Sequence, residues 1–250
     1  ALLLPEDDPR AHPLTLANPI SQDQIAMRTT LIPGLLNGLR TSAASGWRGA
    51  VRLFEQGRVF LRTAPGSSDH VEHDAVAGLV FDGTDPRTPW KGQEEDFFSV
   101  KADVAALLEG RGFAPRFVAG RQPFGHTGQT AEVRAAAPDG SVRSLGWLAR
   151  LKPALEQGLG LGDRAVILFE LRLADLEESV RPVLRPASAF PASLRDISML
   201  APLDRTQDQA ASDIRAAARG AAGWDILKEL RLFDVYEGKG IPEGFRSLAF

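Results

Sequence analysis

Residues 158–164 read Gly-Leu-Gly-Leu-Gly-Asp-Arg, a glycine-rich run of the kind that can bind phosphate. A dinucleotide-binding loop has glycine at its first, third and sixth positions, whereas the sixth position here is Asp163. The P-loop pattern also fails, because no Gly-Lys-Ser/Thr follows. Phosphates bind where a glycine loop opens a helix, since the helix N-terminus presents free N–H groups. This run instead follows a predicted helix and precedes an apolar strand, so we interpret it as a helix-ending turn.

Two further segments contain residues that can ligate a metal ion or move a proton. The run 69–74, Asp-His-Val-Glu-His-Asp, offers imidazole and carboxylate ligands, but it falls in a predicted polar loop at 63–74. A solvated loop is therefore favoured over a metal site. His126 could serve as a general base, but the sequence places no Ser or Asp partner beside it, so a turn-stabilising histidine is favoured.

The composition is ordinary for a soluble globular protein of 250 residues, with 44% apolar and 24% charged residues. The net charge of −3 argues against a surface dominated by nucleic-acid binding, although a local basic patch remains open. The absence of cysteine excludes disulfides, zinc ribbons and thiol catalysis. No stretch approaches 18 uncharged apolar residues, so no membrane partner is expected. The chain lacks a starting Met and stops in an apolar segment, so we expect a piece of a longer protein.

The hydrophobic patterning predicts an α+β fold that contains antiparallel hairpins. Pro138-Asp139-Gly140 is a strong turn signal, so short strands at 130–137 and 141–148 are expected to form a hairpin. The nearly continuous apolar run 165–173 predicts a buried central strand. The predicted helices are 29–42, 99–110, 148–159 and 206–220, and the other predicted strands are 51–62 with a break at Gly57, 75–83, 195–202, 227–238 and one beginning at 245.

Local signals mark several of the helix boundaries. Pro33 suits the first position of a helix, Ser99 is expected to cap the second helix, and Thr206 or Asp204 the last. Three prolines within ten residues predict a linker at 182–191. The sequence therefore predicts two domains, residues 1–186 and residues 187–250.

Nine motifs follow one another in order along nearly the whole chain. They are NPIS (18–21), MRTTLIPGLLNGLR (27–40), VRLFEQGRVF (51–60), DFFSVKADVAALLE (96–109), HTGQTA (126–131), LGWLARLKPAL (145–155), LFELRLADL (168–176), FPASLRDISML (190–200) and LFDVYEGKGIPEGFRSLAF (232–250). In this order they resemble the C-terminal part of the β subunit of the bacterial phenylalanyl-tRNA synthetases (phenylalanine–tRNA ligases). The last motif is close to a signature on its own.

The resemblance implies a class II synthetase-like antiparallel sheet with flanking helices, followed by a partial ferredoxin-like βαββαβ domain. Residues 1–186 would form a catalytic-like module that lacks the catalytic motifs. Residues 187–250 would form the start of the anticodon-binding domain, truncated after its βαβ part and the opening of the next strand. Two stretches depart from the usual family pattern, at 126–131 and at 150–153. Both lie in the non-catalytic module and suggest a divergent sequence.

The resemblance also implies partners and cofactors. The family enzyme is an (αβ)₂ tetramer in the cytoplasm, whose α subunit holds the ATP and phenylalanine sites. The whole enzyme uses ATP and magnesium, whereas this chain would bind no cofactor and no metal and would hold no catalytic residue. Its partners would be the α subunit and tRNA, with no membrane and no DNA. Residues 158–164 resemble an ATP-binding signature of class II synthetases, but the Arg of that signature belongs on a helix that follows the glycines.

Contact with tRNA would need basic side chains for phosphates and aromatic rings for bases. The RNA-binding candidates are Arg195, Arg231, Lys239 and Arg246 for phosphate, with Phe233 and Tyr236 for stacking. Residues 187–250 contain eight Lys or Arg against nine Asp or Glu, a net charge of −1. Several of these charges are therefore interpreted as ordinary surface residues.

Two hypotheses follow for the function. In the first, the chain is a fragment of the β subunit of a phenylalanine–tRNA ligase that supports the catalytic α subunit and contributes to tRNA binding. The alternative is a free-standing paralogue that acts as a binding or regulatory module. The length of the reading frame separates them, since roughly 700–850 residues would indicate the multi-domain subunit. We also expect the last 60 or so residues to be the less stable part, because half a ferredoxin-like sheet leaves an apolar face uncovered.

Overall fold

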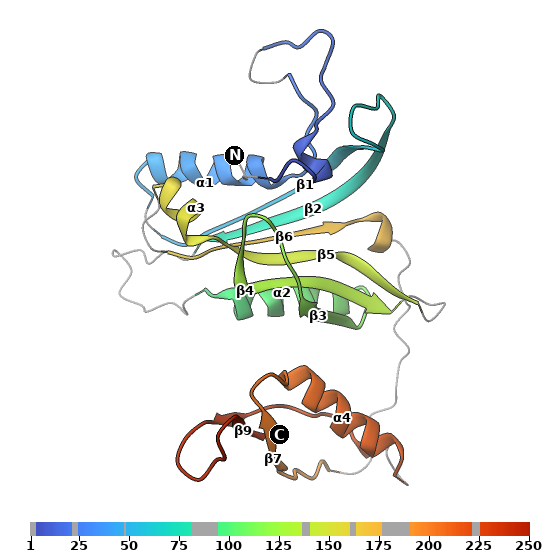
Figure 1. Cartoon of the computed structure of the whole chain (residues 1–250), viewed down its shortest axis with the longest axis vertical. Helices are drawn as coiled ribbons and strands as arrows, with labels where there is room; N and C mark the ends of the chain where they lie inside the picture. The colour runs from blue at the N-terminus through green and yellow to red at the C-terminus, as the bar shows by residue number, and fades with distance from the viewer. Residues whose placement is uncertain are drawn as a thin grey trace. The chain divides into compact units, whose positions relative to one another are not determined.

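The computed structural model describes residues 4–21, 25–47, 49–81, 95–136, 141–160, 164–176, 191–221 and 226–250. The chain divides into two compact units, residues 1–183 and residues 184–250, which Figure 1 shows. The predicted linker at 182–191 and the turn at 138–140 lie outside the described residues, except for Pro191. Within the described part, no helix is long and apolar enough to cross a membrane.

The first unit is built on a six-stranded antiparallel sheet in the order β1-β2-β6-β5-β4-β3. Its strands are β1 Val51–Arg62, β2 His70–Phe81, β3 Pro115–Ala119, β4 Gly125–Ala136, β5 Val142–Leu151 and β6 Val166–Arg172. The α+β class is confirmed. Strand β6 lies between β2 and β5, so the apolar run 165–173 does form a central strand.

Helices cover both faces of this sheet, as Figure 1 shows for α1 (Ile32–Ala44) on one face and α2 (Phe97–Glu109) on the other. The first helix buries Leu35 and Leu39 against alternate residues of the strands, among them Leu168. The second helix packs on the opposite side, where Ile167 belongs to its core. Adjacent residues of β6 therefore enter different cores, which explains why this strand is apolar from Val166 to Phe169.

The helix boundaries agree with one sequence signal and correct one predicted cap. Pro33 lies in the first turn of α1. Asp96, rather than Ser99, is the N-cap of α2, and its carboxylate accepts hydrogen bonds from the N–H groups of Phe98 and Ser99. The Ser99 hydroxyl completes a capping box by reaching back to the N–H of Asp96.

Several predicted strand limits were wrong. Strand β1 is continuous through Gly57, and β2 begins at His70 inside the predicted loop. Strand β4 begins five residues earlier than predicted, and β3 was not predicted. The segment predicted as a helix at 148–159 is the end of β5 followed by the short helix α3, Pro153–Gly158. Short 3₁₀ turns at Pro9–Ala11 and Ala174–Leu176 complete the unit.

In its described residues, the second unit consists of a three-stranded antiparallel sheet and one helix. The strands β7 (Ser198–Pro202), β9 (Phe245–Ala249) and β8 (Asp234–Tyr236) follow in that order across the sheet. Strand β8 is much shorter than the predicted 227–238. Helix α4 (Gln207–Arg219) matches its prediction, and Thr206 rather than Asp204 caps it together with Gln209.

Candidate functional site

The glycine run does end a helix, as the sequence analysis predicted. Helix α3 finishes at Gly158, and β6 begins at Val166. Gly160 has φ +71°, a left-handed conformation that glycine adopts without steric cost. Residues 161–163 lie outside the described part. No helix opens after the described glycines, so the run lacks the N-terminal amide groups that bind phosphate elsewhere.

A buried ion pair fixes α3 and the turn to the sheet. The Glu156 side chain is 2% exposed, and its two oxygens accept hydrogen bonds from Arg150 Nε and Nη2 at 3.1 and 3.0 Å. The same carboxylate accepts the N–H of Val166 at 3.0 Å. The hydrogen bonds from Glu156 hold the pKa of Arg150 above its usual value. Sequence analysis missed this pair. Its only signal in the sequence was Glu156, an acidic residue next to the apolar Leu155 in a short helix.

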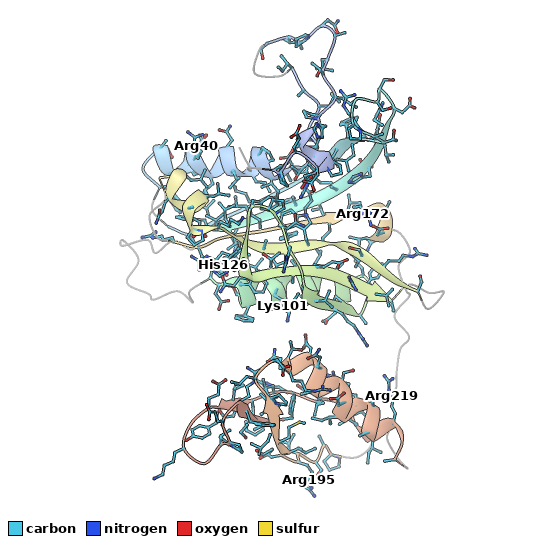
Figure 2. The ribbon with its side chains drawn as sticks, viewed as in Figure 1. Arg40, Lys101, His126, Arg172, Arg195 and Arg219 are labelled. Carbon is cyan, nitrogen blue, oxygen red and sulfur yellow. The ribbon has the colours of Figure 1, made fainter. Side chains whose placement is uncertain are left out.

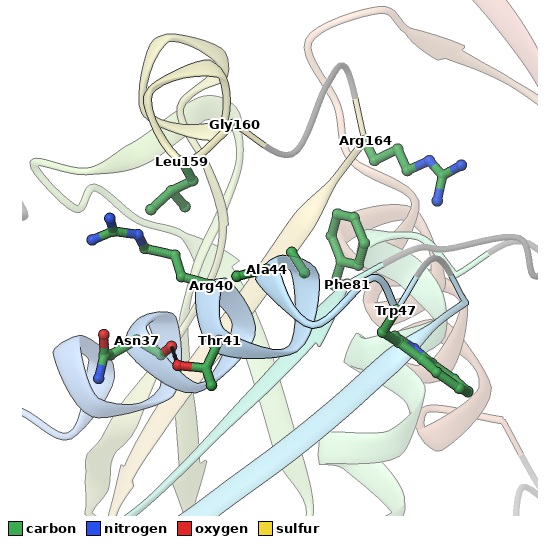
Figure 3. Close-up of a pocket in the computed structure, with 10 residues that line it drawn as sticks. Asn37, Arg40, Thr41, Ala44, Trp47, Phe81, Leu159, Gly160 and Arg164 are labelled. Atoms are coloured by element: carbon green, nitrogen blue, oxygen red, sulfur yellow. Dashed lines mark hydrogen bonds between the residues drawn. The ribbon is translucent and has the colours of Figure 1, made fainter.

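An open pocket of about 820 Å³ lies between the C-terminal half of α1 and the glycine turn (Figure 3). Its polar lining includes Asn37, Arg40 and Arg164, and its aromatic lining is Trp47 and Phe81. The Arg164 guanidinium lies 6.0 Å from the centroid of the Phe81 ring. Figure 3 shows the two guanidinium groups on opposite sides of the pocket, so they do not converge on one point.

The polarity of α1 also disfavours a nucleotide in this pocket. The helix contributes to the lining Asn37, Arg40, Thr41, Ala43 and Ala44, which all lie toward its C-terminal end. The carbonyl groups at a helix C-terminus carry partial negative charge, which opposes phosphate binding. The geometry thus agrees with the failed sequence patterns, and the glycine run serves the packing of the sheet.

The two histidine segments take structural roles. His126 Nδ1 accepts the N–H of Gly128 at 3.1 Å, which makes it the turn-stabilising histidine that was expected. The run 69–74 is not a loop, since His70 to Asp74 belong to β2. Arg58 on the neighbouring strand pairs with Glu72 and Asp74 at 3.0 and 3.3 Å. Among the described residues, no group of three His, Asp or Glu could hold a metal ion.

The RNA-binding candidates are spread over the second unit, and the structure brings together only some of them. Arg195 is exposed before β7, where Figure 2 labels it, and its guanidinium donates to the carbonyl of Leu194 at 2.8 Å. Tyr236 and Lys239 lie together at the end of β8, because the tyrosine hydroxyl donates to the Lys239 carbonyl at 3.3 Å. Arg231 is exposed in the segment before β8.

Arg246 is already engaged within the unit. Its Nη2 donates to the carbonyl of Arg205 at 2.8 Å, and its Nη1 lies 3.8 Å from Glu237. Arg246 lies two residues before Leu248 in β9, so both side chains face the same side of the sheet. Leu248 is buried in the core with residues of α4, so Arg246 projects to the side that α4 covers. This candidate therefore holds β9 to the start of α4.

The two aromatic candidates do not form one stacking platform. Val235 pairs with the buried Leu248 and faces α4, whereas Tyr236 pairs with Ser247 and faces the opposite side. Side chains two residues apart in an extended segment face the same side, so Phe233, which directly precedes β8, lies on the side of Val235. Phe233 and Tyr236 are 57% and 48% exposed, so each is accessible from its own side.

Comparison with known families gives two matches that together cover most of the chain. A family described as "Phenylalanyl tRNA synthetase beta chain CLM domain" matches residues 1–173. A family described as "Ferredoxin-fold anticodon binding domain" matches residues 188–250. The observed β7-α4-β8-β9 order agrees with the first part of a ferredoxin-like fold.

The chain is also similar to curated proteins that are named phenylalanine–tRNA ligase beta subunits. The phenylalanine–tRNA ligase beta subunits of Pseudomonas putida and Pseudomonas savastanoi pv. phaseolicola are each 41% identical over 96% of this chain. The corresponding subunit of Xanthomonas oryzae pv. oryzae is 36% identical over 94%. The chain spans 28–29% of the length of these relatives. The chain belongs to the phenylalanyl-tRNA synthetase β chain family.

Proposed function

We propose that this chain is part of the β subunit of a cytoplasmic phenylalanine–tRNA ligase, where it supports a catalytic α subunit and contributes to tRNA binding. The observation that carries the proposal is the pair of family matches, at 1–173 and 188–250, in the order of the predicted domains. Residues 1–186 act as the non-catalytic module and residues 187–250 as part of the anticodon-binding domain. ATP and magnesium are used by the whole enzyme, on the α subunit.

The open edge of β1 is the surface that we assign to the α subunit. Strand β1 is the first strand of the sheet, and among the described residues its outer edge is paired only with Arg28. The Phe60 N–H donates to the Arg28 carbonyl at 2.9 Å, and Arg28 Nε donates to the Arg58 carbonyl at 2.7 Å. At 52, 54 and 56 the described residues supply no partner for this edge. Phe54 lies in this edge strand, and its side chain is 81% exposed. An uncovered strand edge beside an apolar side chain is a template for pairing with another chain.

Substitution of Phe54 tests the docking surface. In a co-expression with the α subunit, Phe54→Asp should reduce recovery of the complex by more than about tenfold, because a charge replaces the apolar contact at the edge. Val142→Asp is the matched control, since Val142 is 65% exposed on β5, which β2 and β6 separate from β1. Undiminished assembly of the Phe54 variant would rule out this edge as the docking surface.

For tRNA, the exposed candidates around β8 support the proposal better than Arg246 does. Lys239→Ala should weaken binding of the phenylalanine tRNA. It should also make the slope of log K against log [salt] shallower by the amount expected for the loss of about one phosphate contact. Arg215→Ala on α4, a substitution of an exposed cation outside the candidate set, should leave the slope unchanged. Equal losses in both variants would remove the assignment to the β8 region.

Catalysis tests the division of labour between the subunits. The purified chain should show no phenylalanine-dependent exchange between ATP and pyrophosphate, because its role is to support catalysis on the α subunit. The α subunit with the complete β subunit is the positive control. Measurable exchange by the purified chain alone would overturn the proposal.

A further inference from the structure

A second cavity, of about 380 Å³, lies on the sheet face that carries α1. The core beneath α1 includes Val166 and Leu168 of β6, and the next residues on that face are Glu170 and Arg172, which line the cavity instead. Figure 2 labels Arg172 at the end of this strand. The cavity is thus the part of the face that α1 leaves uncovered, and its size is within the range of roughly 300–1,000 Å³ typical of small-molecule sites.

Glu170 places a carboxylate in this cavity with only one oxygen satisfied. Its Oε2 accepts hydrogen bonds from the Thr30 hydroxyl at 2.7 Å and the Leu31 N–H at 2.8 Å. Its Oε1 has no hydrogen-bond partner among the described residues. Burial raises the pKa of Glu170, and these two hydrogen bonds and the positive charge of Arg10 only partly oppose that effect. A donor that entered the cavity would complete the coordination of this carboxylate.

The loop between β3 and β4 supplies two more groups without partners. The amide oxygen of Gln122 is buried and accepts no hydrogen bond, and Gln122 lines the cavity. Its neighbour Arg121 also lines the cavity, is exposed, and makes no ion pair within the described part of the chain. The site therefore presents two acceptors that lack a donor and one cation that lacks an anion.

The other charged groups of the cavity are already paired. Arg10 binds Asp8 with two hydrogen bonds, Glu132 pairs with Arg134 at 2.5 Å, and Arg172 lies 2.8 Å from Asp175. Burial and the charge of Arg172 lower the pKa of His73, which favours the neutral imidazole. The groups left for a ligand are therefore Glu170, Gln122 and Arg121.

An aromatic surface and a close backbone approach give the cavity a fixed floor. Trp147 lines it, is 9% exposed, and packs edge-on against Phe124 with ring centroids 5.1 Å apart. Gly146, with φ +152°, lets β5 approach the carbonyl of Glu170, where a Cβ would lie 2.0 Å from that oxygen. These contacts hold Glu170 and Trp147 in place without a ligand.

We propose that this cavity binds a small zwitterion that carries a primary ammonium and a carboxylate, the chemistry of a free α-amino acid. The ammonium donates to Glu170 Oε1 and Gln122 Oε1, and the carboxylate pairs with the Arg121 guanidinium. Trp147 and Leu61, which also line the cavity, contact the side chain of the ligand. The site belongs to the first unit alone and requires neither the α subunit nor tRNA, so it does not depend on the function proposed above.

Calorimetric titration of the complete 250-residue chain with each of the twenty free amino acids, up to about 10 mM, tests the proposal. At least one of them should bind saturably. Its N-acetyl and methyl ester derivatives should each bind at least about tenfold more weakly, because each removes one of the two charges. Since the titrated chain is free of the α subunit, binding cannot come from the α subunit's phenylalanine site.

Two variants locate the site. Glu170→Gln keeps the shape of the side chain and removes its charge, and Arg121→Ala changes an exposed loop residue that makes no described ion pair. Each should weaken binding at least about tenfold, whereas Arg40→Ala in the pocket beside α1 should leave it unchanged. Thermal unfolding of each variant verifies the fold, and Arg121→Ala decides the matter if Glu170→Gln unfolds. Absence of saturable binding, equal binding of the derivatives, or wild-type affinity in a folded Arg121→Ala variant would overturn the proposal.

Discussion

The two units of the chain use the same kind of layer, a helix on an antiparallel sheet, but bury very different cores. Among the described residues, the first unit has two core clusters of sixteen and fourteen buried residues, one on each face of its sheet. The second has a single cluster of five, three of which are alanines. Since burial of apolar side chains is the main stabilising term in folding, the first unit has much more to hold it together.

The exposed apolar residues complete this contrast. On the second unit, Leu200, Tyr236 and Phe245 lie on the sheet face opposite α4, and each is at least 40% exposed. Both faces of the first sheet are covered by a helix over much of their area. The part that α1 leaves open is lined mainly by polar and charged side chains. A well-buried scaffold can hold a polar cavity, whereas a thin layer exposes a surface suited to a partner.

Hydrogen exchange should show the largest difference. Amide protons of β2 and β6 should be protected at least about two orders of magnitude more strongly than those of β7 and β9, because opening the second unit exposes little apolar surface. Native-state exchange of the intact chain, followed by mass spectrometry, measures both regions in one sample. Equal protection of the two units would break the comparison.

The buried ion pair of the first unit should give the largest effect of a single substitution. Glu156→Gln leaves the Arg150 guanidinium, whose side chain is only 25% exposed, without its anion, so we expect a loss of about 2–4 kcal/mol in unfolding free energy. Urea unfolding followed by near-ultraviolet circular dichroism measures it. Glu55→Gln is the control, because Glu55 forms an exposed ion pair with Arg28 whose loss should cost at most about 0.5 kcal/mol. Similar losses in the two variants would show that burial of Glu156 contributes little.

Features set by local sequence signals were predictable. The helix at 206–220 was placed almost to the residue, because Thr206 and Gln209 form a capping box and Gly220 follows the helix. The central strand was predictable from its nearly continuous apolar run. The helix predicted at 148–159 was wrong because β5 is buried on both faces, and a strand of that kind shows no period of two.

Features that depend on partners far along the chain were not predictable. The charged residues 70–74 looked like a loop, yet they extend β2 because Arg58 on β1 compensates Glu72 and Asp74. Glu170 became recognisable as a site residue only once the fold placed it against Thr30, 140 positions away in the sequence. The same applies to Arg246, which the composition offered as a phosphate ligand and the fold uses as a bridge to Arg205.

Removal of that bridge should affect the second unit alone. Arg246→Ala deletes the hydrogen bond to the Arg205 carbonyl, so we expect the unit to lose about 1–2 kcal/mol, seen as faster amide exchange in β7 and β9. Exchange in β6 should not change. Lys239→Ala is the control for this region, since its exposed side chain should affect tRNA binding and not exchange. A loss of tRNA binding in Arg246→Ala without faster exchange would restore Arg246 as a direct RNA ligand.

The smallest expected effect is a change in the pH dependence of the melting temperature of the first unit. It compares Glu170 and Glu132, two carboxylates that line the same cavity. Burial raises the pKa of Glu170, so the folded state holds the proton more tightly than the unfolded state does, and stability falls as pH rises through its titration. The hydrogen bond from Arg134 lowers the pKa of Glu132, so the stability that Glu132 contributes is lost as pH falls. Relative to Glu170→Gln, the wild-type melting temperature should therefore decline as pH rises above about 4.3, and relative to Glu132→Gln it should decline as pH falls below about 4.3. Each change should be no more than about 3 °C in a unit of this size. Differences of the same sign in the two series would show that Glu170 is more solvated than its place under Thr30 indicates.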